Sequence, residues 1–262
     1  MNDRKDKKYK RLGERRYNYQ GCLMEITEYN NSLDIAVEFK DIYKAKIHSY
    51  YHHFLSGNIK NPYYPSVSGV GMIGIKYPSR EKGKHTKEYQ TWRHMLERCF
   101  DEKTKEKRPY YKDVTCCKEW LLYENFYEWL HSQENFDKWL NGERWALDKD
   151  ILIKRNKVYS PETCCLVPYN VNCLFTKRNS CRGTLPIGVI EHNGKFIAEC
   201  NNPFKPYKNY LGIYSTQEEA FFVYKECKEI IIKQVAQIEF DNGNITEKCY
   251  NAMMNYQVEI TD

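Results

Sequence analysis

Thiols and imidazoles are the first side chains to consider for chemistry, because they bind metals and act as nucleophiles or bases. The chain has eleven cysteines and seven histidines. The adjacent pairs Cys116-Cys117 and Cys164-Cys165 differ from zinc sites, in which two residues usually separate the paired cysteines so that both thiolates reach one ion. No motif places a thiol beside a base. The sequence therefore predicts reduced cysteines in the core, and it makes a zinc ion an unlikely cofactor.

Oxygen ligands offer a second kind of chemistry. Carboxylate and amide oxygens are hard ligands of the kind that magnesium prefers. A divalent ion held by such oxygens could neutralise charge on a phosphate while a base deprotonates an attacking water.

Basic side chains offer a third chemistry, contact with a polyanion. The 41 lysines and arginines outnumber the 35 acids, which gives a net charge of +6. Eight of the positive charges lie in residues 1–16, which are predicted to form a basic tail, and Lys177, Arg178 and Arg182 form a second basic segment. Such segments either stay solvated or follow the phosphates of a nucleic acid. Both interpretations remain open at this point.

Three short strands and a helix are predicted between residues 187 and 236. Residues 195–201 alternate with a period of two, as in a sheet with two different faces. His192-Asn193-Gly194 is a hairpin signal, and Thr216 with Glu219 has the spacing of a capping box. Apolar residues then recur at helical spacing: Ala220, Val223, Tyr224, Cys227, Ile230 and Ile231. The helix is expected to cover one face of the sheet and to leave the other free.

Short motifs in this stretch occur in the order of a known module. They are Ile187-Gly188-Val189, Gly194-Lys195-Phe196-Ile197-Ala198-Glu199, Tyr210-Leu211-Gly212 and Thr216-Gln217-Glu218-Glu219-Ala220. Residues 185–236 thereby resemble the AP2-type DNA-binding domain. The resemblance implies that the uncovered sheet face lies in the major groove of double-stranded DNA. The implied contact residues are Ile190, His192, Glu199, Asn201, Lys208 and Tyr210, with Lys177, Arg178 and Arg182 on the phosphates.

The chain departs from the plant members of that family on this face. Ile190, His192 and Asn201 occupy positions where the family has arginines. Bidentate contacts to guanine are therefore expected to be fewer, and the sequence preference is expected to differ.

A second resemblance covers residues 89–180. It is carried by the pattern Tyr89-x-x-Trp92-x-x-Met95-x-x-Arg98-Cys99, then by Trp145-Ala146-Leu147-Asp148-Lys149-Asp150, Asn156, Tyr159-Ser160-Pro161 and Asn172. This range is similar to the HNH endonucleases of phages and mobile elements, in which an AP2-type domain often follows. The resemblance implies a ββα-metal fold that uses one divalent ion to hydrolyse phosphodiesters.

Some residues of this chain suit the roles that the HNH resemblance implies, and others do not. Asp148 takes the ligand position and Asn172 the helical position, and this hard-oxygen pair makes them the implied magnesium ligands. Lys149, however, replaces the histidine that serves as general base. A lysine of ordinary pKa is protonated and cannot accept a proton. The asparagine that orients the hairpin in the family falls near Glu162-Thr163 and is also lost. The sequence thus favours a DNA-binding protein whose nuclease site is weakened or lost.

Two alternatives remain open. One is an active, magnesium-dependent nicking or homing endonuclease. The other is a phage-encoded regulator, or an inhibitor of a host defence protein, that uses the degenerate HNH fold as a protein-binding surface.

The remaining residues complete a modular α+β chain. Strands at 23–29, 33–39 and 43–47 and a helix at 48–55 predict a small β-barrel-like domain over residues 17–76. A linker is expected at 77–90, and residues 237–262 form a C-terminal tail. No apolar run approaches a membrane span, and the basic N-terminus lacks the apolar region of a signal peptide. A cytoplasmic location is therefore expected, in the host bacterium if the chain is phage-encoded.

Overall fold

The computed structural model of the chain describes residues 10–142, 144–176, 183–204 and 209–262. Helices and strands are mixed, which confirms the α+β class. The chain divides into two compact units, Met1–Trp129 and Leu130–Asp262. The division lies in helix α5 (Tyr123–His131), inside the range 89–180 that resembles one HNH-like domain.

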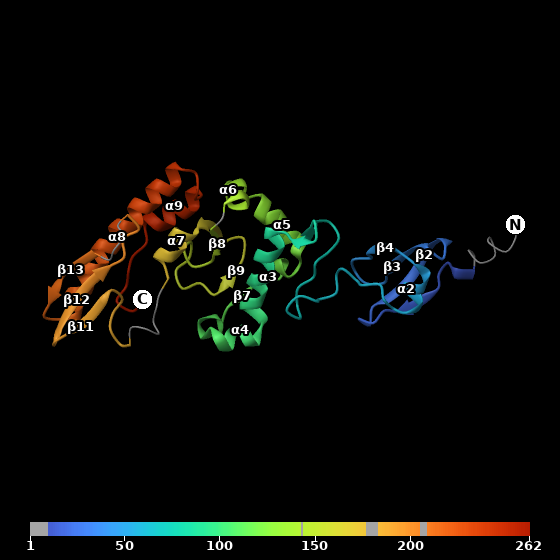
Figure 1. The fold of residues 1–262 in the computed structure, drawn as a ribbon, viewed down its shortest axis with the longest axis horizontal. Coiled ribbons are helices and arrows are strands. Elements are labelled where there is room, and N and C mark those ends of the chain that lie inside the picture. Colours follow the sequence, from blue (N-terminus) through green and yellow to red (C-terminus); the bar gives the residue numbers. More distant parts are fainter. Residues whose placement is uncertain (1–9, 143, 177–182, 205–208) are drawn as a thin grey trace. The chain divides into compact units, whose positions relative to one another are not determined.

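Unit 1 begins with four strands that pair in chain order as an antiparallel sheet (Figure 1). They are β1 (Arg15–Tyr17), β2 (Leu23–Asn31), β3 (Asp34–Phe39) and β4 (Lys46–Ser49). Alternate residues of β2 and β3, such as Ile26 and Val37, share a core with Phe54 of helix α2 (Tyr51–Leu55). Strands, turns and helix thus follow the predicted order. Two arginines of the predicted basic tail, Arg15 and Arg16, lie in β1.

The barrel-like arrangement predicted for residues 17–76 is wrong. Within the described residues the four strands form an open sheet, and the outer strands β1 and β4 each pair on one side only. Closure into a barrel requires enough tilted strands for the sheet to curl back on itself. β1 has three residues and β4 has four, which is too little edge for closure. Residues of α2 pack against the buried side chains of the sheet instead.

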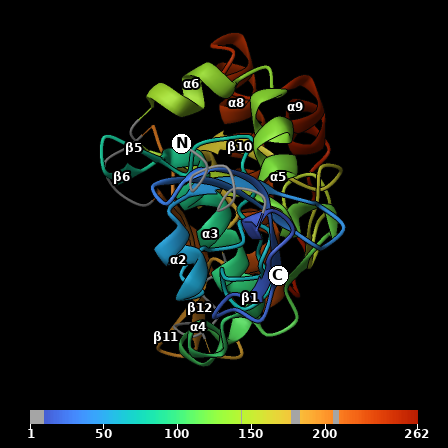
Figure 2. The same ribbon diagram turned by 90° about the vertical axis from the view of Figure 1, so that its right-hand side faces the viewer.

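The rest of unit 1 is built on helix α3 (Lys87–Phe100), which is labelled in Figure 2. The hydroxyl of Thr86 accepts a hydrogen bond from the Tyr89 backbone N–H and begins the helix. The predicted apolar stripe is buried: Tyr89, Trp92, Met95, Leu96 and Cys99. The indole N–H of Trp92 donates to the Trp120 carbonyl at 2.7 Å. The predicted linker, residues 77–90, therefore overlaps the start of α3, where core packing begins. It also contains a hairpin of β5 (Arg80–Glu81) and β6 (Lys84–His85).

Short elements complete this part of the chain. They are α4 (Glu102–Lys107), η1 (Pro109–Tyr111), β7 (Thr115–Cys116), η2 (Glu119–Leu121) and α5.

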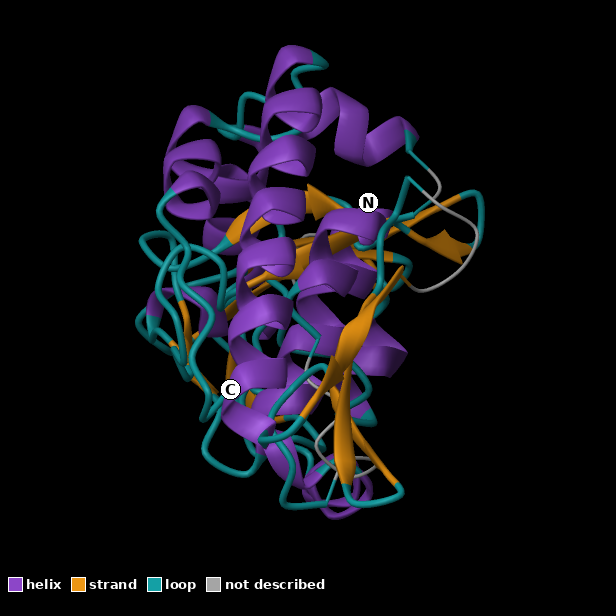
Figure 3. Cartoon of the chain, turned by 90° about the vertical axis from the view of Figure 1, so that its left-hand side faces the viewer, coloured by secondary structure: helices purple, strands orange, loops and turns teal. Residues whose placement is uncertain are grey.

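Unit 2 contains two layered pieces. After α6 (Phe136–Asn141), strand β8 (Trp145–Asp148) pairs antiparallel with β10 (Cys165–Pro168). The short strand β9 (Val158–Tyr159) lies between β8 and β10 in the sequence, and helix α7 (Tyr169–Leu174) directly follows β10. Strands β11 (Val189–His192), β12 (Lys195–Cys200) and β13 (Asn209–Tyr214) then form an antiparallel sheet. The long helix α8 (Gln217–Asp241) runs along this sheet, and α9 (Glu247–Met254) packs against α8 (Figure 3).

Helix α8 begins as predicted but buries a partly different face. Thr216 and Glu219 form both hydrogen bonds of the capping box. Ile230, expected in the core, is 57% exposed, whereas Phe221 and Ile232 are buried. The difference arises because α8 is longer than predicted: it extends beyond residue 236, and its second half packs against α9. The buried face therefore shifts around the helix from its first half to its second.

None of the described helices is both long enough and apolar enough to span a lipid bilayer.

Candidate nucleic-acid interface and the ββα segment

Asp148 lies at the end of β8 and is buried. Its Oδ1 atom accepts hydrogen bonds from the backbone N–H groups of Asp150 at 2.7 Å and Ile151 at 2.8 Å. Burial raises the pKa of the Asp148 carboxyl, and these two hydrogen bonds act in the opposite direction. The carboxylate therefore turns the chain after β8, which is a structural role.

Lys149 is also buried, and its ammonium group has two acceptors. Nζ donates to Asp150 Oδ2 at 2.7 Å and to the Asn156 carbonyl at 2.8 Å. It also lies 5.9 Å from the centre of the Tyr159 ring. An amine that donates to these groups closes the loop after β8. It has no geometry for accepting a proton from water, which is what a general base requires.

Asn156 holds the same loop from the other side. Its side-chain amide donates to the Lys149 carbonyl at 2.9 Å and to the Val158 carbonyl at 2.6 Å. The resemblance places the orienting asparagine near Glu162-Thr163, where the Thr163 hydroxyl donates to the Val158 carbonyl at 2.7 Å. The bridging role thus falls on Asn156, six residues earlier than Glu162 in the chain. In the sequence, the only indication of this role is that Asn156 lies in the polar loop between β8 and β10.

Asn172 lies on α7 and is half-buried, while Val171 and Leu174 on the same helix are buried. In the described ranges, no three His, Cys, Asp or Glu side chains gather as a metal site. We call β8, β10 and α7, with the loop between the two strands, the ββα segment. A magnesium ion fits this segment poorly, because Asp148 is engaged by backbone N–H groups and the Lys149 ammonium is bonded to the neighbouring Asp150.

The adjacent pair Cys164-Cys165 lies in the core, as predicted, whereas Cys173 on α7 is exposed. Cys164 and Cys165 are each 3% exposed. Burial raises the pKa of Cys164 to about 12, so its thiol stays protonated at neutral pH. The other adjacent pair, Cys116-Cys117, is half-buried in unit 1.

The three-stranded sheet has one covered and one uncovered face. Val189, Ala198 and Cys200 are buried in the core that includes α8. On the opposite face, Ile190 pairs with Ile197, and Ile197 pairs with Ile213 on the third strand. The side chains of Ile190 and Ile213 are 43% and 45% exposed, and Tyr210 is 63% exposed. We call Ile190, Ile197 and Ile213 the isoleucine row.

Four of the predicted contact residues share this uncovered face. Ile190 and His192 lie on β11, Glu199 on β12, and Tyr210 on β13 opposite Glu199. Asn201 follows the end of β12 and is exposed. Lys208, Lys177, Arg178 and Arg182 lie outside the described residues. Sequence reasoning missed Lys195, Ile197 and Ile213, although Lys195 and Ile197 have the same parity as Glu199 along β12.

Two glycine positions explain the local geometry of the sheet. Asn193 and Gly194 both have positive φ, 51° and 72°, which is the geometry of a tight hairpin, and this turn sets His192 opposite Lys195. Gly188 has a φ of 79°, and a Cβ there would lie 2.0 Å from the Tyr224 ring. The Gly-Val motif therefore marks a close approach between the start of the sheet and α8.

We compared the chain with protein-family models, with curated proteins and with solved structures, and no match was found in any of the three.

Proposed function

We propose that this protein binds duplex DNA through the uncovered face of strands β11–β13. The observation that carries the proposal is the exposure of that face, because α8 packs on the opposite one. Strands in a sheet are about 4.8 Å apart, so the outer strands are roughly 10 Å apart. The major groove of B-DNA is about 12 Å wide. The dimensions of the sheet therefore suit insertion into that groove.

The chemistry of the face suggests which bases it contacts. The isoleucine row crosses its centre and carries no donor for guanine O6 or N7. Apolar side chains contact the 5-methyl group of thymine in the major groove. Lys195 and His192 at the hairpin tip, with Tyr210, supply polar contacts to bases or phosphates. We infer a preference for thymine-rich sites over guanine-rich sites.

We further infer that the ββα segment is a weakened or lost nuclease site. Lys149 is a hydrogen-bond donor at the position of the base, and Asp148 caps the turn after β8. The ββα segment would then have a structural role, as a part of unit 2 that stabilises the three-stranded sheet.

The DNA-binding proposal is tested by fluorescence anisotropy of the full chain with a thymine-rich duplex at low salt. Ile213→Glu places a negative charge in the centre of the uncovered face, and we expect affinity to fall at least about tenfold through repulsion from phosphates. Ile230→Glu is the matched control, because Ile230 is similarly exposed on α8. Equal affinity of Ile213→Glu and wild type, with the fold intact, contradicts the proposal.

A plasmid-nicking assay with magnesium or manganese tests the second inference. We expect no nicking. Asp148→Asn is the informative variant, because an asparagine retains the side-chain oxygen that accepts from Asp150 and Ile151. Metal-dependent nicking by wild type that disappears in Asp148→Asn would establish an active endonuclease.

The isoleucine row also favours a second candidate function, binding of a protein partner. A contiguous apolar strip with few charges is typical of the centre of a protein interface. Such a partner fits the role of a regulator or an inhibitor of a host protein. It is favoured if Ile213→Glu abolishes biological activity while wild type shows no salt-dependent affinity for DNA.

A further inference from the structure

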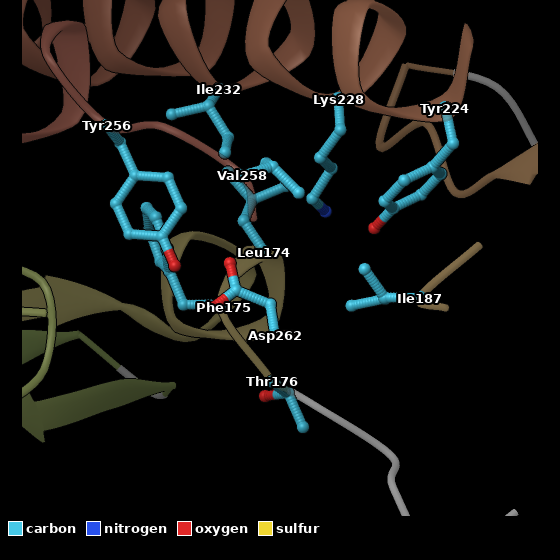
Figure 4. Close-up of a pocket in the computed structure, with 10 residues that line it drawn as sticks. All are labelled: Leu174, Phe175, Thr176, Ile187, Tyr224, Lys228, Ile232, Tyr256, Val258 and Asp262. Atoms are coloured by element: carbon cyan, nitrogen blue, oxygen red, sulfur yellow. The ribbon is translucent and has the colours of Figure 1, made fainter. Parts of the chain in front are cut away.

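A small pocket lies under helix α8, entirely within unit 2 (Figure 4). Its apolar wall includes Leu174 at the end of α7, Ile232 of α8 and Val258 of the segment after α9. Two charged side chains, Lys228 and Asp262, point into the same space. The cavity volume is about 20 Å³, which is room for one or two particles of the size of a water molecule.

Lys228 is the unusual group in this pocket. Its side chain comes from α8 and is 8% exposed. Among the described residues no side chain or carbonyl accepts a hydrogen bond from its Nζ. Lys225, one turn earlier, differs: its Nζ lies 2.7 Å from Glu229 and 2.6 Å from the Val258 carbonyl. Burial of an ammonium without a counter-charge is unfavourable, so Lys228 favours a partner that the described part of the chain does not supply.

Asp262 does not serve as that partner. Its carboxylate is already 2.8 Å from Lys154 and 3.6 Å from Arg155. It also accepts a hydrogen bond from the Glu259 backbone N–H at 3.0 Å. Lys154 and Arg155 also pair with Glu259, at 3.4 and 2.7 Å, so two cations balance two acids. Among the described residues, Lys228 is then the additional positive charge at the pocket.

Three thiols interact with the charge of Lys228: those of Cys173, Cys200 and Cys227. Burial lowers the pKa of Lys228, and the three thiols act in the opposite direction. Burial also raises the pKa of Cys200 to about 12, so that thiol is neutral and is no counter-ion at neutral pH.

We propose that this pocket is a binding site for a small monovalent anion, with Lys228 as its counter-charge. The volume admits a halide ion or a carboxylate as small as formate, and it excludes phosphate and sugar acids. The bound ion connects α8 with the end of α7 and the segment that contains Val258. It therefore stabilises the junction between the ββα segment and the three-stranded sheet. The site is independent of DNA binding.

The test is the melting temperature of the full chain as chloride replaces gluconate at constant ionic strength. Gluconate is too large for the cavity, so only specific binding separates the two salts. We expect the wild-type melting temperature to rise with chloride and to saturate, by roughly 3–6 °C at ten times the dissociation constant. Formate is expected to act like chloride. A response to phosphate alone contradicts the proposal, because it indicates a larger, surface site.

Lys228→Met and Lys233→Met form the matched pair of variants. Both remove one lysine from α8, but Lys233 is exposed. Lys228→Met should lose the chloride response and should melt no lower than wild type in gluconate, because it removes an uncompensated charge. Lys233→Met should keep the response. Broadening of the chloride-35 NMR line by wild type, absent in Lys228→Met, is the second readout. Equal responses of wild type and Lys228→Met overturn the proposal.

Discussion

The ββα segment and the three-stranded sheet of unit 2 use their polar residues in opposite ways. In the ββα segment, Asp148, Lys149 and Asn156 are bonded to backbone or side-chain groups of their own loop. In the sheet, the uncovered face carries side chains that remain in contact with solvent, Tyr210 most of all. In the ββα segment the polar groups stabilise the fold, whereas on the sheet they remain accessible to a binding partner.

This difference shows why a motif position alone does not establish chemistry. A polar group that becomes buried needs hydrogen-bond partners, and if the chain supplies them the group is no longer available to a metal or substrate. Asp148 is of the residue type expected for a metal ligand, but its carboxylate accepts hydrogen bonds from the backbone of a turn. The exposed face of the sheet lacks the arginines that the AP2-type resemblance leads one to expect, but its side chains are not engaged by the chain's own backbone in the same way.

The largest expected effect is the loss of stability in Gly188→Ala. The residue has a φ of 79°, and its new Cβ would lie 2.0 Å from the Tyr224 ring, so backbone strain and overpacking act together. We expect a cost of about 2–5 kcal/mol in the free energy of unfolding, measured by urea denaturation. Gly194→Ala is the control, because it has a φ of 72° with nothing within 4 Å of a Cβ, and it should cost about 1–2 kcal/mol. Equal costs would mean that the sheet is not seated tightly on α8.

The sheet and α8 were the best predicted parts of the chain, and the reason is local. The hairpin at Asn193-Gly194 and the capping box at Thr216 depend on residues within four positions of each other, so their signals are complete in the sequence. The buried face of α8 was only partly predicted, because α9 packs against its second half, and no local signal announces that contact. The same limit applies to the open sheet of unit 1, since whether strands close into a barrel depends on edges far apart in the chain.

The candidate sites divide in the same manner. The resemblance to the AP2-type domain implied a shared face for Ile190, His192, Glu199 and Tyr210, and the strand register places these four residues on one face of the sheet. The part played by Asn156 was not foreseen, because it depends on how a polar loop of irregular conformation folds back on Lys149. Lys228 was hidden for a similar reason. In the sequence it is one lysine of a mixed helix, and only the packed structure shows that it is buried with no hydrogen-bond acceptor among the residues that the structure describes.

A second prediction tests the structural role of the ββα loop. Asn156→Ala removes donors to the Lys149 and Val158 carbonyls and should cost about 1–3 kcal/mol in unfolding free energy. Asn172→Ala should cost about 0.5 kcal/mol or less, because it removes a half-buried amide from α7. Melting temperatures with and without millimolar magnesium complete the measurement. A magnesium-dependent rise that Asn172→Ala abolishes would restore Asn172 as a metal ligand.

A third prediction concerns the isoleucine row. Replacing thymine by deoxyuridine in the bound duplex removes the 5-methyl group that the row is proposed to contact. Each buried methyl is worth about 0.8 kcal/mol, so affinity should fall about three- to fourfold per contacted base. Replacing cytosine by 5-methylcytosine adds a methyl in the same groove and serves as the control, which should not weaken binding. If uracil DNA binds as tightly as thymine DNA, the isoleucines do not contact bases, even though DNA binding itself stands.

The smallest expected effect is a pH dependence at Asp148, and its sign separates a turn residue from a metal ligand. Burial raises the folded-state pKa of this carboxyl above its ordinary value of 3.8, so the folded protein holds the proton more tightly than the unfolded chain. The stability contributed by the group is then fully present below about pH 4 and decreases as the pH rises through the folded-state pKa. Asp148→Asn keeps the acceptor for Asp150 and Ile151 but does not titrate, so the stability of wild type relative to this variant should decline across that window. A relative stability that instead increases with pH would mean that a cation stabilises the carboxylate, and the ββα segment would then resemble a metal site more than a turn.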